Sequence, residues 1–311
     1  MSVDGTFAPF LVLAPATTAN LGPGFDCLAL ALDLHNTIEV LPALGFAVPL
    51  VVVEGEGTAI LSGVDANLVL RAMRHLESRL GCPLPPFRLR QRNLIPLGRG
   101  LGSSAAAIAG GLVAAATLLG LSIAPEALLP FALEIESHPD NVAAALYGGL
   151  TIGVLDAGGA VVLRLEPPPG LRAVVLVPEG FSGTLESRAV LPREVSRADA
   201  VFNTSRCALL AGDLALGRLD GLAIAMQDRL HQPQRGASQF PYLEKAIAAA
   251  VGAGAYGAAL SGSGSSVLAL ASPEHEVAVA AALETVARCH QLPARTLLLS
   301  PAAEGARVTP G

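Results

Sequence analysis

The chain has 311 residues, of which 52% are hydrophobic and 15% are charged, so it is long enough for two domains and is neither disordered nor a coiled coil. Its net charge of −6 argues against a nucleic-acid-binding surface, and Lys245 is the only lysine, so arginines, helix N-termini or a metal ion must supply most cationic groups. The four cysteines, Cys27, Cys82, Cys207 and Cys289, form no CxxC pair, which excludes a disulfide scaffold or zinc motif and favours reduced thiols.

The first half of the chain alternates short apolar runs with turn residues. The N-terminal segment, MSVDGTFAPF, has no basic region before an apolar run, so it is not a signal peptide and we expect a cytoplasmic protein. Strands are predicted at 9–18, 27–41, 46–57, 86–94, 150–156 and 160–166. Helices are predicted at 68–80 with a cap at 65–67, from the loop at 96–104 to about 120, at 125–136 and at 141–147.

The segment PPPG at 167–170 predicts a domain boundary, since three prolines and a glycine favour a stiff surface connection. It divides the chain into an N-terminal domain, 1–167, and a C-terminal domain, 168–311. In the second domain, strands are predicted at 171–178, within 255–271 and at 294–300, and helices at 197–212, 215–230, 241–253 and 274–290. This mixed order predicts an α+β fold with two layers, and the tail after Ala302 is predicted to be unstructured.

The apolar run AAAIAGGLVAAATLLGLSIA at 105–124 has the length of a membrane span, and the mean hydropathy of the chain is +0.54. Its residues are mostly alanine and glycine, however, and it has neither flanking Lys/Arg asymmetry nor aromatic belts. We therefore expect no membrane association, and a helix that is buried on most sides within a soluble domain.

The segment PLGRGLGSSAAAIAGG, Pro96 to Gly111, places glycines and hydroxyls at the start of that helix. It lacks the lysine of GxxxxGK[ST], and neither its glycine spacing nor its surroundings fit a dinucleotide-binding fingerprint. A flexible linker is the structural alternative. Against it, backbone N–H groups at a helix N-terminus attract anions, and Ser103 and Ser104 add hydroxyls. The pattern favours a phosphate-binding loop.

Two further segments carry polar residues that fit a substrate site. In ATTANLGPGFDCLALALDL, residues 16–34, Asn20 and Asp26 bracket a tight loop; they either form an ordinary turn or bind an amino or hydroxyl group. In EIESHPDNVAAALYGG, residues 134–149, acidic residues precede His138. They are either solvated helix-end carboxylates or a Mg²⁺ ligand beside the phosphate loop.

The second half contributes Arg188 in TLESRAVLP and Arg235 in MQDRLHQPQR. Each is either a surface charge or a guanidinium that binds a substrate carboxylate in bidentate fashion. A second glycine-rich loop, GAALSGSGSS at 257–266, is a weak signal by itself.

Together, these segments in this order resemble the GHMP kinase superfamily, and ATTANLGPGFDCLALAL, HPDN, ESRAVLP and HQPQR resemble its homoserine kinases. The resemblance covers about residues 11–300. It implies an N-terminal domain like the second domain of ribosomal protein S5 and a ferredoxin-like C-terminal domain. It also implies transfer of a phosphoryl group from ATP, with Mg²⁺, to the hydroxyl of L-homoserine in threonine biosynthesis. The alternative is a kinase of another small alcohol, such as mevalonate or a sugar; a homodimer is compatible with the family.

The resemblance also implies site residues. The triphosphate would lie against Pro96, Leu97, Gly98, Arg99, Gly100, Leu101, Gly102, Ser103, Ser104, Ala105 and Ala106, and the adenine near Asn67. Mg²⁺ would be held by Ser104 or Ser103 and by Glu134, with Glu136 as the alternative to Glu134.

Homoserine would contact Asn20, Asp26, His138 and Asn141, with its α-carboxylate on Arg188 and Arg235 and its ammonium group on Asp26. Asn141, Glu134 and Ser104 are the expected catalytic residues. Two questions stay open at this point: whether Asp140 or no residue acts as general base, and whether Arg99 and Arg92 reach a phosphate or solvent.

Overall fold

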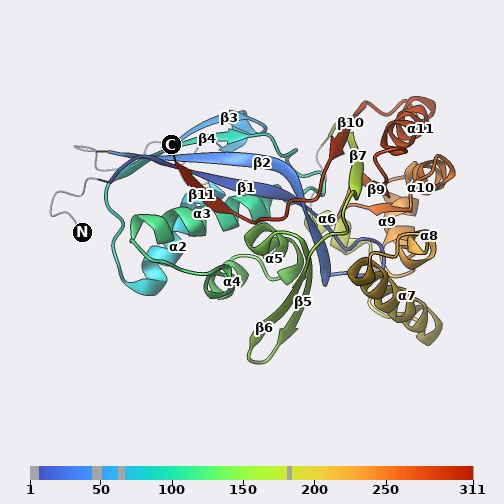
Figure 1. Cartoon of the computed structure of the whole chain (residues 1–311), viewed down its shortest axis with the longest axis horizontal. Helices are drawn as coiled ribbons and strands as arrows, with labels where there is room; N and C mark the ends of the chain where they lie inside the picture. Colours follow the sequence, from blue (N-terminus) through green and yellow to red (C-terminus); the bar gives the residue numbers. More distant parts are fainter. Residues whose placement is uncertain (1–6, 44–50, 62–66, 181–183, 311) are drawn as a thin grey trace.

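A computed structural model describes residues 7–43, 51–61, 67–180 and 184–310, and these form two β-sheets with helices packed against them (Figure 1). The first sheet has the strand order β11-β1-β2-β4-β3, and β5 pairs with both β2 and β6. Its strands are β1 (Phe10–Ala19), β2 (Leu28–Pro42), β3 (Val51–Gly55), β4 (Phe87–Asn93), β5 (Leu150–Asp156), β6 (Gly159–Leu165) and β11 (Arg307–Pro310). Its helices are α1 (Thr58–Leu61), α2 (Leu68–Leu80), α3 (Ser103–Leu118), α4 (Pro125–Leu133) and α5 (Pro139–Tyr147). The predicted α+β class is confirmed.

The second sheet is antiparallel, with the order β10-β7-β9-β8. Its strands are β7 (Arg172–Pro178), β8 (Gly257–Leu260), β9 (Val267–Ala271) and β10 (Ala294–Leu299). The helices of this half are α6 (Thr184–Ala189), α7 (Arg197–Leu216), α8 (Leu222–Ala225), α9 (Gln232–Ser238), α10 (Leu243–Gly252) and α11 (Glu276–Cys289). The expected boundary at 167/168 falls between β6 and β7, which belong to different sheets.

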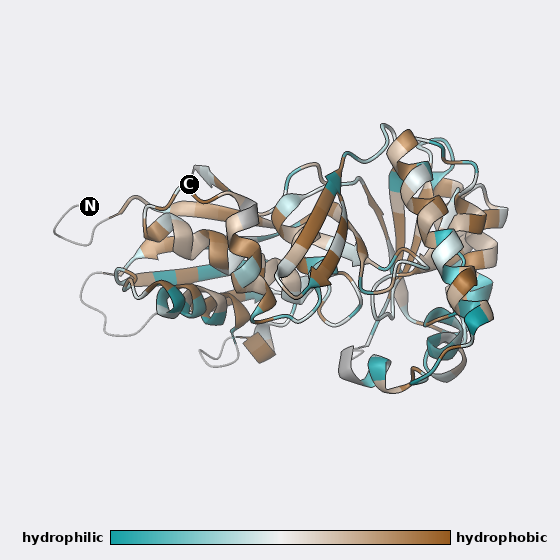
Figure 2. Cartoon of the chain, turned by 90° about the horizontal axis from the view of Figure 1, so that it is seen from below, coloured by the Kyte–Doolittle hydropathy of each residue, from teal (hydrophilic) through white to brown (hydrophobic). Residues whose placement is uncertain are grey.

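The side chains of β7 alternate between the two faces of the second sheet, and this explains how the two halves of the chain share a core. Val174 and Leu176 point to one face of the second sheet, where α10 and α11 pack. Val175 points to the other face, and it belongs to a hydrophobic cluster that includes Ala14 of β1 and Leu28 of β2. In Figure 2 the outer helices carry both hydrophilic and hydrophobic residues, as expected of helices with one face on a core. The first and second sheets are therefore joined by buried apolar contacts.

Small residues let α3 lie deep in the first half of the chain. A Cβ atom on Gly111 would lie 2.5 Å from the Val69 carbonyl oxygen of α2, and one on Gly110 would lie 2.4 Å from Ile38 Cδ1 of the sheet. The alanine- and glycine-rich composition is thus the consequence of close packing on several sides. In the described part of the chain, no helix combines the length and the apolar character that crossing a membrane requires.

Three sequence predictions are wrong in detail. The tail after Ala302 is not unstructured, because β11 pairs with β1 and returns the chain to the first sheet. The helix predicted at 215–230 is absent: Gly217, in the left-handed conformation (φ 66°), ends α7, and only the short α8 follows. The helix predicted at 125–136 is shorter, and it ends at Leu133 with Glu134 as its C-cap residue.

Candidate active site

A cavity of about 280 Å³ opens where the two halves of the chain meet. Its walls come from the turn after β1, the loop before α3, the start of α5, and α6 and α9 of the second half. Of the predicted site residues, those that line it are Asn20, Asp26, Asn67, Leu97, Gly98, Arg99, Gly100, Leu101, Gly102, Ser103, Ser104, Ala105, His138, Asn141, Arg188 and Arg235. The tertiary structure thus brings together these five segments and Asn67, which precedes α2.

The N-terminus of α3 faces this cavity without a side-chain cap. Gly102 occupies the N-cap position in the left-handed conformation (φ 66°), and Ser103 and Ser104 begin the helix. The Ser104 side chain is exposed and Ser103 is half-buried. Uncapped N–H groups and the positive end of the helix dipole together make an anion-binding site.

The second glycine-rich loop braces the first. The Ser261 hydroxyl donates a hydrogen bond to the Gly100 carbonyl oxygen over 2.6 Å, and the Ser266 N–H donates to the Arg99 carbonyl oxygen over 3.2 Å. Gly262 N–H donates to the Ala19 carbonyl oxygen over 3.0 Å, which ties the same loop to the end of β1. The phosphate loop is therefore fixed by contacts from the second half of the chain.

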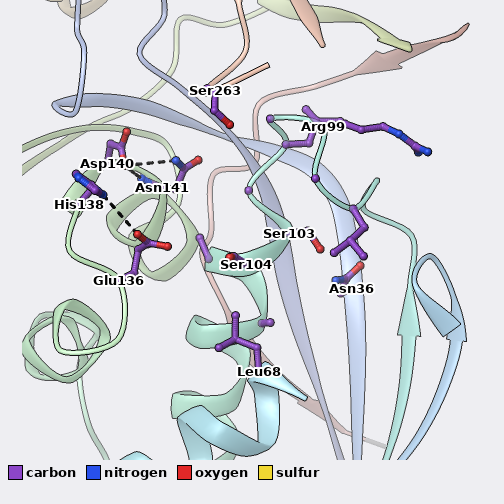
Figure 3. Close-up of a pocket in the computed structure, with 18 of the residues that line it drawn as sticks. Asn36, Leu68, Arg99, Ser103, Ser104, Glu136, His138, Asp140, Asn141 and Ser263 are labelled. Atoms are coloured by element: carbon purple, nitrogen blue, oxygen red, sulfur yellow. Dashed lines mark hydrogen bonds and ion pairs between the residues drawn. The ribbon is translucent and has the colours of Figure 1, made fainter. Parts of the chain in front are cut away.

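Arg99 points away from the helix N-terminus (Figure 3). Its Nε donates to the Gly180 carbonyl oxygen over 3.2 Å, and Nη1 lies 3.5 Å from a carboxylate oxygen of Glu56. The guanidinium thus connects the loop to both halves of the chain. Arg92 is exposed on β4 and is not among the residues that line the cavity.

The position of Glu134 corrects the first choice of metal ligand. Its carboxylate lies 2.9 Å from His75 Nε2 and 3.0 Å from Arg79 Nε, both on α2, and it does not line the cavity. Glu136 does line it, on the same side of α3 as His138 and Asn141 (Figure 3). The short segment between α4 and α5 explains the error, because two residues of sequence move a carboxylate from one surface to another.

The donor set at the cavity fits a magnesium ion. Glu136 offers a carboxylate and Ser104 an exposed hydroxyl, and both are hard oxygen donors of the kind that Mg²⁺ prefers. Among the described residues, no group of three or more His, Cys, Asp and Glu side chains is placed to hold a metal. Few protein ligands are typical of magnesium that is held jointly with substrate phosphates.

Asp140 begins α5 and is buried, with 5% of its surface exposed. Burial raises the pKa of its carboxyl group to about 6, although the Asn141 N–H donates to Oδ1 over 2.7 Å and opposes that rise. The Coulombic effect of Asp26 adds to the rise. A carboxyl group on a cavity wall with a pKa near neutrality is suited to accept a proton.

Thr17 orients the amide of Asn141, and sequence reasoning missed it. Its hydroxyl donates to Asn141 Oδ1 over 2.7 Å, so the Nδ2 group is the end of the amide left to donate. A Cβ atom on Gly102 would lie 1.8 Å from Thr17 Oγ1, so the threonine packs directly under the start of α3. Nothing in the motif distinguished this buried threonine from an ordinary strand residue.

Asn20 shapes the turn between β1 and β2. Its Nδ2 donates to the Gly262 carbonyl oxygen over 2.9 Å, and its Oδ1 accepts from the Asp26 N–H over 3.1 Å. Asn20 and Asp26 both have positive φ, at 70° and 57°, so the turn is held in a restricted backbone conformation. Asn20 lines the cavity, but both ends of its amide are engaged in fixing the turn.

Asp26 and Arg188 form a bidentate ion pair. Arg188 Nη2 and Nη1 lie 2.5 Å and 3.1 Å from the two carboxylate oxygens. His138 Nε2 lies 3.9 Å from the same carboxylate. The predicted ammonium-binding group and one of the predicted carboxylate-binding groups are therefore each other's partners in the free protein.

Arg235 is almost completely buried, with 2% of its surface exposed, and it lies beside the Phe25 ring at 5.5 Å from the ring centre. Burial and, to a smaller extent, the neighbouring Arg188 lower the pKa of its guanidinium to about 10, so the group stays charged at neutral pH. In the part of the chain that the structure describes, no carboxylate lies within ion-pair distance of it.

Asn67 caps α2, as predicted, through a hydrogen bond from the Leu70 N–H to its Oδ1 (3.0 Å). Its amide is also paired with that of Gln91 through two hydrogen bonds of 3.0 Å and 3.2 Å. Leu61, Leu68 and Leu97 line the same end of the cavity. An apolar wall with a few fixed amides is suited to a flat heterocycle.

Comparison with known proteins agrees with this geometry. The model of the GHMP kinases N terminal domain matches residues 67–149, and that of GHMP kinases C terminal matches residues 210–288. A homoserine kinase of Desulfitobacterium hafniense is 44% identical over 297 residues, which cover 96% of this chain and 99% of that protein. One of Deinococcus radiodurans is 48% identical and covers 84% of this chain and 83% of that protein.

Solved structures show the same fold. A homoserine kinase from Cytophaga hutchinsonii superposes with a TM-score of 0.88 at 28% identity and covers 98% of both chains. A mevalonate kinase of L. major, solved with R-mevalonate, has a TM-score of 0.69 at 19% identity and covers 93% of this chain and 95% of that chain. At this low identity, the similarity to the mevalonate kinase shows a shared fold only.

Proposed function

The chain belongs to the homoserine kinases of the GHMP kinase superfamily, and from this premise we propose that it transfers the γ-phosphoryl group of ATP to the side-chain hydroxyl of L-homoserine. The observation that carries the proposal is the charge arrangement next to the phosphate loop. Asp26, Arg188 and Arg235 line one part of the cavity, and the uncapped N-terminus of α3 lines another. The first part suits a zwitterion and the second suits a triphosphate.

Residues 96–106 would hold the triphosphate through backbone N–H groups and the helix dipole, in place of a lysine. Mg²⁺, when bound, would neutralise phosphate charge, with Glu136 and Ser104 as its protein ligands. The adenine would occupy the apolar end of the cavity near Asn67 and Leu68. Arg99 would position the loop through Gly180 and Glu56 and would not contact a phosphate.

Homoserine would exchange partners with the internal ion pair. Its ammonium group would bind Asp26, and its carboxylate would bind Arg188 and Arg235, so both charges of the Asp26–Arg188 pair keep a partner. A sugar has no charge to offer, and mevalonate has no ammonium group. A mevalonate carboxylate that took Arg188 would leave the half-buried Asp26 without a partner, which costs about 1–3 kcal/mol. A sugar would gain no ionic contact from the Asp26–Arg188 pair. The site therefore favours a zwitterionic alcohol.

At the reacting end, Asn141 would donate from Nδ2 to the substrate hydroxyl, because Thr17 holds its Oδ1. Asp140 would accept the hydroxyl proton. This contribution is supplementary, since phosphoryl transfer through a loose transition state depends mainly on positioning and charge neutralisation. We further propose that the product, O-phospho-L-homoserine, serves threonine biosynthesis in the cytoplasm.

The function is tested by coupled ADP release with homoserine, mevalonate and galactose at equal concentrations. We expect ADP release with homoserine and no more than the background rate with the other two. 3-Aminopropanol and 4-hydroxybutanoate, each lacking one charge of homoserine, extend the test to the zwitterion. Folded protein that gives no ADP with homoserine in the presence of Mg²⁺ would refute the proposal.

Replacing Asp26 should abolish the discrimination between homoserine and 4-hydroxybutanoate. In Asp26→Asn, loss of a charged partner for the ammonium group should lower kcat/KM for homoserine by about tenfold to hundredfold. The rate with 4-hydroxybutanoate should change much less, because that substrate has no ammonium group to lose. Asp33→Asn, an exposed aspartate on β2, is the control and should retain the wild-type preference. A preference that is unchanged in Asp26→Asn would contradict this assignment.

Replacing Asp140 should change stability and turnover in opposite directions. The pKa of Asp140 is raised from 3.8 to about 6, so the folded state binds the proton of this carboxyl group more tightly than the unfolded state does. Proton binding therefore stabilises the folded state at low pH, and this stabilisation is lost as the pH rises from about 4 through 6. Asp140→Asn removes this cost and should be more stable than wild type by about 2–3 kcal/mol at pH 7, with no gain below pH 4. Its kcat should fall about a hundredfold.

Thermal melts between pH 4 and pH 8, paired with turnover assays, measure both effects. A variant that is stabilised and fully active would remove the proton-acceptor role and leave a mechanism without a general base. A stability difference between Asp140→Asn and the wild type that does not change with pH would contradict the raised pKa of the buried Asp140 carboxyl group.

A further inference from the structure

His231 is the one histidine of the described residues with 0% of its surface exposed, and both of its ring nitrogens are engaged. Nε2 lies 2.7 Å from the Gly22 carbonyl oxygen, and Nδ1 lies 3.0 Å from Arg235 Nη1. A carbonyl oxygen only accepts and a guanidinium only donates. These two contacts together therefore require the neutral imidazole that carries its proton on Nε2.

This ring connects two parts of the cavity wall. Gly22 lies at the centre of the turn from Asn20 to Asp26, and Arg235 lies on α9 in the second half of the chain. The Phe25 ring of the same turn packs against the imidazole, with 5.2 Å between ring centres. The histidine thus contacts the turn through a hydrogen bond and through an aromatic face, and it contacts Arg235 through a second hydrogen bond.

Arg235 is held at three points. Nε donates to the Ser187 carbonyl oxygen over 3.1 Å, and Nη1 donates to the Gly262 carbonyl oxygen over 3.1 Å as well as to His231. Nη2 makes no hydrogen bond with the described residues. Of these three partners, His231 contributes a side-chain atom, and Ser187 and Gly262 contribute backbone carbonyl oxygens. The orientation in which Nη2 is left for a ligand therefore depends on the position of one imidazole.

The imidazole is itself fixed by Asp228. Its Oδ2 accepts from the backbone N–H groups of His231 (2.9 Å) and Gln232 (2.7 Å), and its Oδ1 accepts from the Leu230 N–H (3.0 Å). Asn203 Nδ2 of α7 donates to the same Oδ1 over 2.6 Å. This carboxylate holds the backbone that carries the ring, and His231 Nε2 is farther from it, at 3.7 Å, than from Gly22.

We propose that His231 is a positioning residue that couples Arg235 to the Asn20–Asp26 turn, so that the cationic and anionic binding groups for the substrate zwitterion move as one unit. The proposal deepens the function proposed above and rests on it for the identity of the substrate. A fixed spacing between Arg235 and Asp26 would suit an α-amino acid, because its carboxylate and ammonium groups are attached to the same carbon atom. Burial lowers the pKa of His231, which keeps the ring neutral as this coupling requires.

Two amide replacements separate the two contacts. An asparagine at this position places its Oδ1 near the site of Nδ1, which keeps the acceptor for Arg235 and loses the donor to Gly22. A glutamine reaches the site of Nε2, which keeps the donor and loses the acceptor. We expect both His231→Asn and His231→Gln to raise KM for homoserine about tenfold, because each loses one hydrogen bond, to Arg235 or to the turn that carries Asp26. Both should change KM for ATP less than twofold.

Leu283→Ala is the matched control for stability, since Leu283 is buried in α11 against the second sheet and does not line the cavity. It should lower Tm and leave both KM values unchanged. A selective rise in KM for homoserine in the His231 variants supports the coupling. Unchanged KM values, or a parallel rise for both substrates, would overturn it.

Two readouts do not depend on the substrate. Amide hydrogen exchange of the turn should be faster in His231→Asn than in Leu283→Ala, at Gly24 and Asp26, whose N–H groups bond to Asn20. In the wild-type protein at pH 7.5, ¹⁵N NMR should show one solvent-protected imidazole with its proton on Nε2; a protected Nδ1–H or imidazolium would overturn the proposal without any variant. Failure of wild-type protein to phosphorylate homoserine, with both readouts as expected, would instead refute the proposed function alone.

Discussion

Glu136→Gln is expected to lower kcat by about a hundredfold to a thousandfold while it leaves KM for homoserine close to the wild-type value. Glu136 lines the cavity beside the N-terminus of α3, where the phosphates would lie, and the amide replacement removes a charged oxygen ligand without changing the size of the side chain. Initial rates measured over a range of Mg²⁺ concentrations check the result. The variant should need more Mg²⁺ for half-maximal rate, because its weakened site binds the ion less tightly.

Glu134→Gln is the matched control, because the two glutamates are separated by one residue. Glu134 pairs with His75 and Arg79 on the outside of α2, so its replacement should cost less than about 1 kcal/mol of stability and change kcat less than about twofold. If turnover is lost in Glu134→Gln and kept in Glu136→Gln, the metal ligand is Glu134 and our assignment is wrong.

Gly100→Ala should have the second large effect, on ATP. Gly100 has φ of 76°, and a Cβ atom there would lie 2.0 Å from the Ser261 carbonyl oxygen, which is backbone and cannot rotate away. The substitution must separate the two glycine loops or displace the phosphate loop. A shift of about 1 Å in a positioned group costs on the order of a hundredfold in kcat/KM. We expect this loss with ATP as the varied substrate, together with a lower Tm.

Gly120→Ala separates backbone strain from the steric clash. Gly120 follows the other end of α3 with φ of 66°, and no atom lies within 4 Å of its added Cβ. It should lose about 1 kcal/mol of stability, as any alanine in a left-handed position does, and keep the wild-type KM for ATP. Equal kinetic effects in the two variants would show that contact between the two glycine loops does not determine ATP binding.

Local sequence signals predicted most of the secondary structure, because they depend on residues that are close in the chain. The Asn67 cap and the Gly81 C-cap place α2 at the predicted residues, and Ser103 and Ser104 begin α3 directly after the glycines of the loop. The α+β class and the kinase family follow from such motifs. The pairing of β11 with β1 was out of reach, since β11 becomes a strand only through contact with a strand at the other end of the chain.

The sequence alone determined which chemical groups are present: a glycine- and serine-rich loop without lysine, two arginines and an aspartate, and carboxylates near HPDN. Only the tertiary structure decided which of them meet. It placed Glu136, and not Glu134, on the cavity wall, directed Arg99 to Glu56 and Gly180, and paired Asp26 with Arg188. It also revealed Thr17 and His231 as the supports of Asn141 and Arg235. The physical reason is that a motif records residue type and spacing, whereas a site depends on side-chain direction and on contacts between segments that the fold brings together.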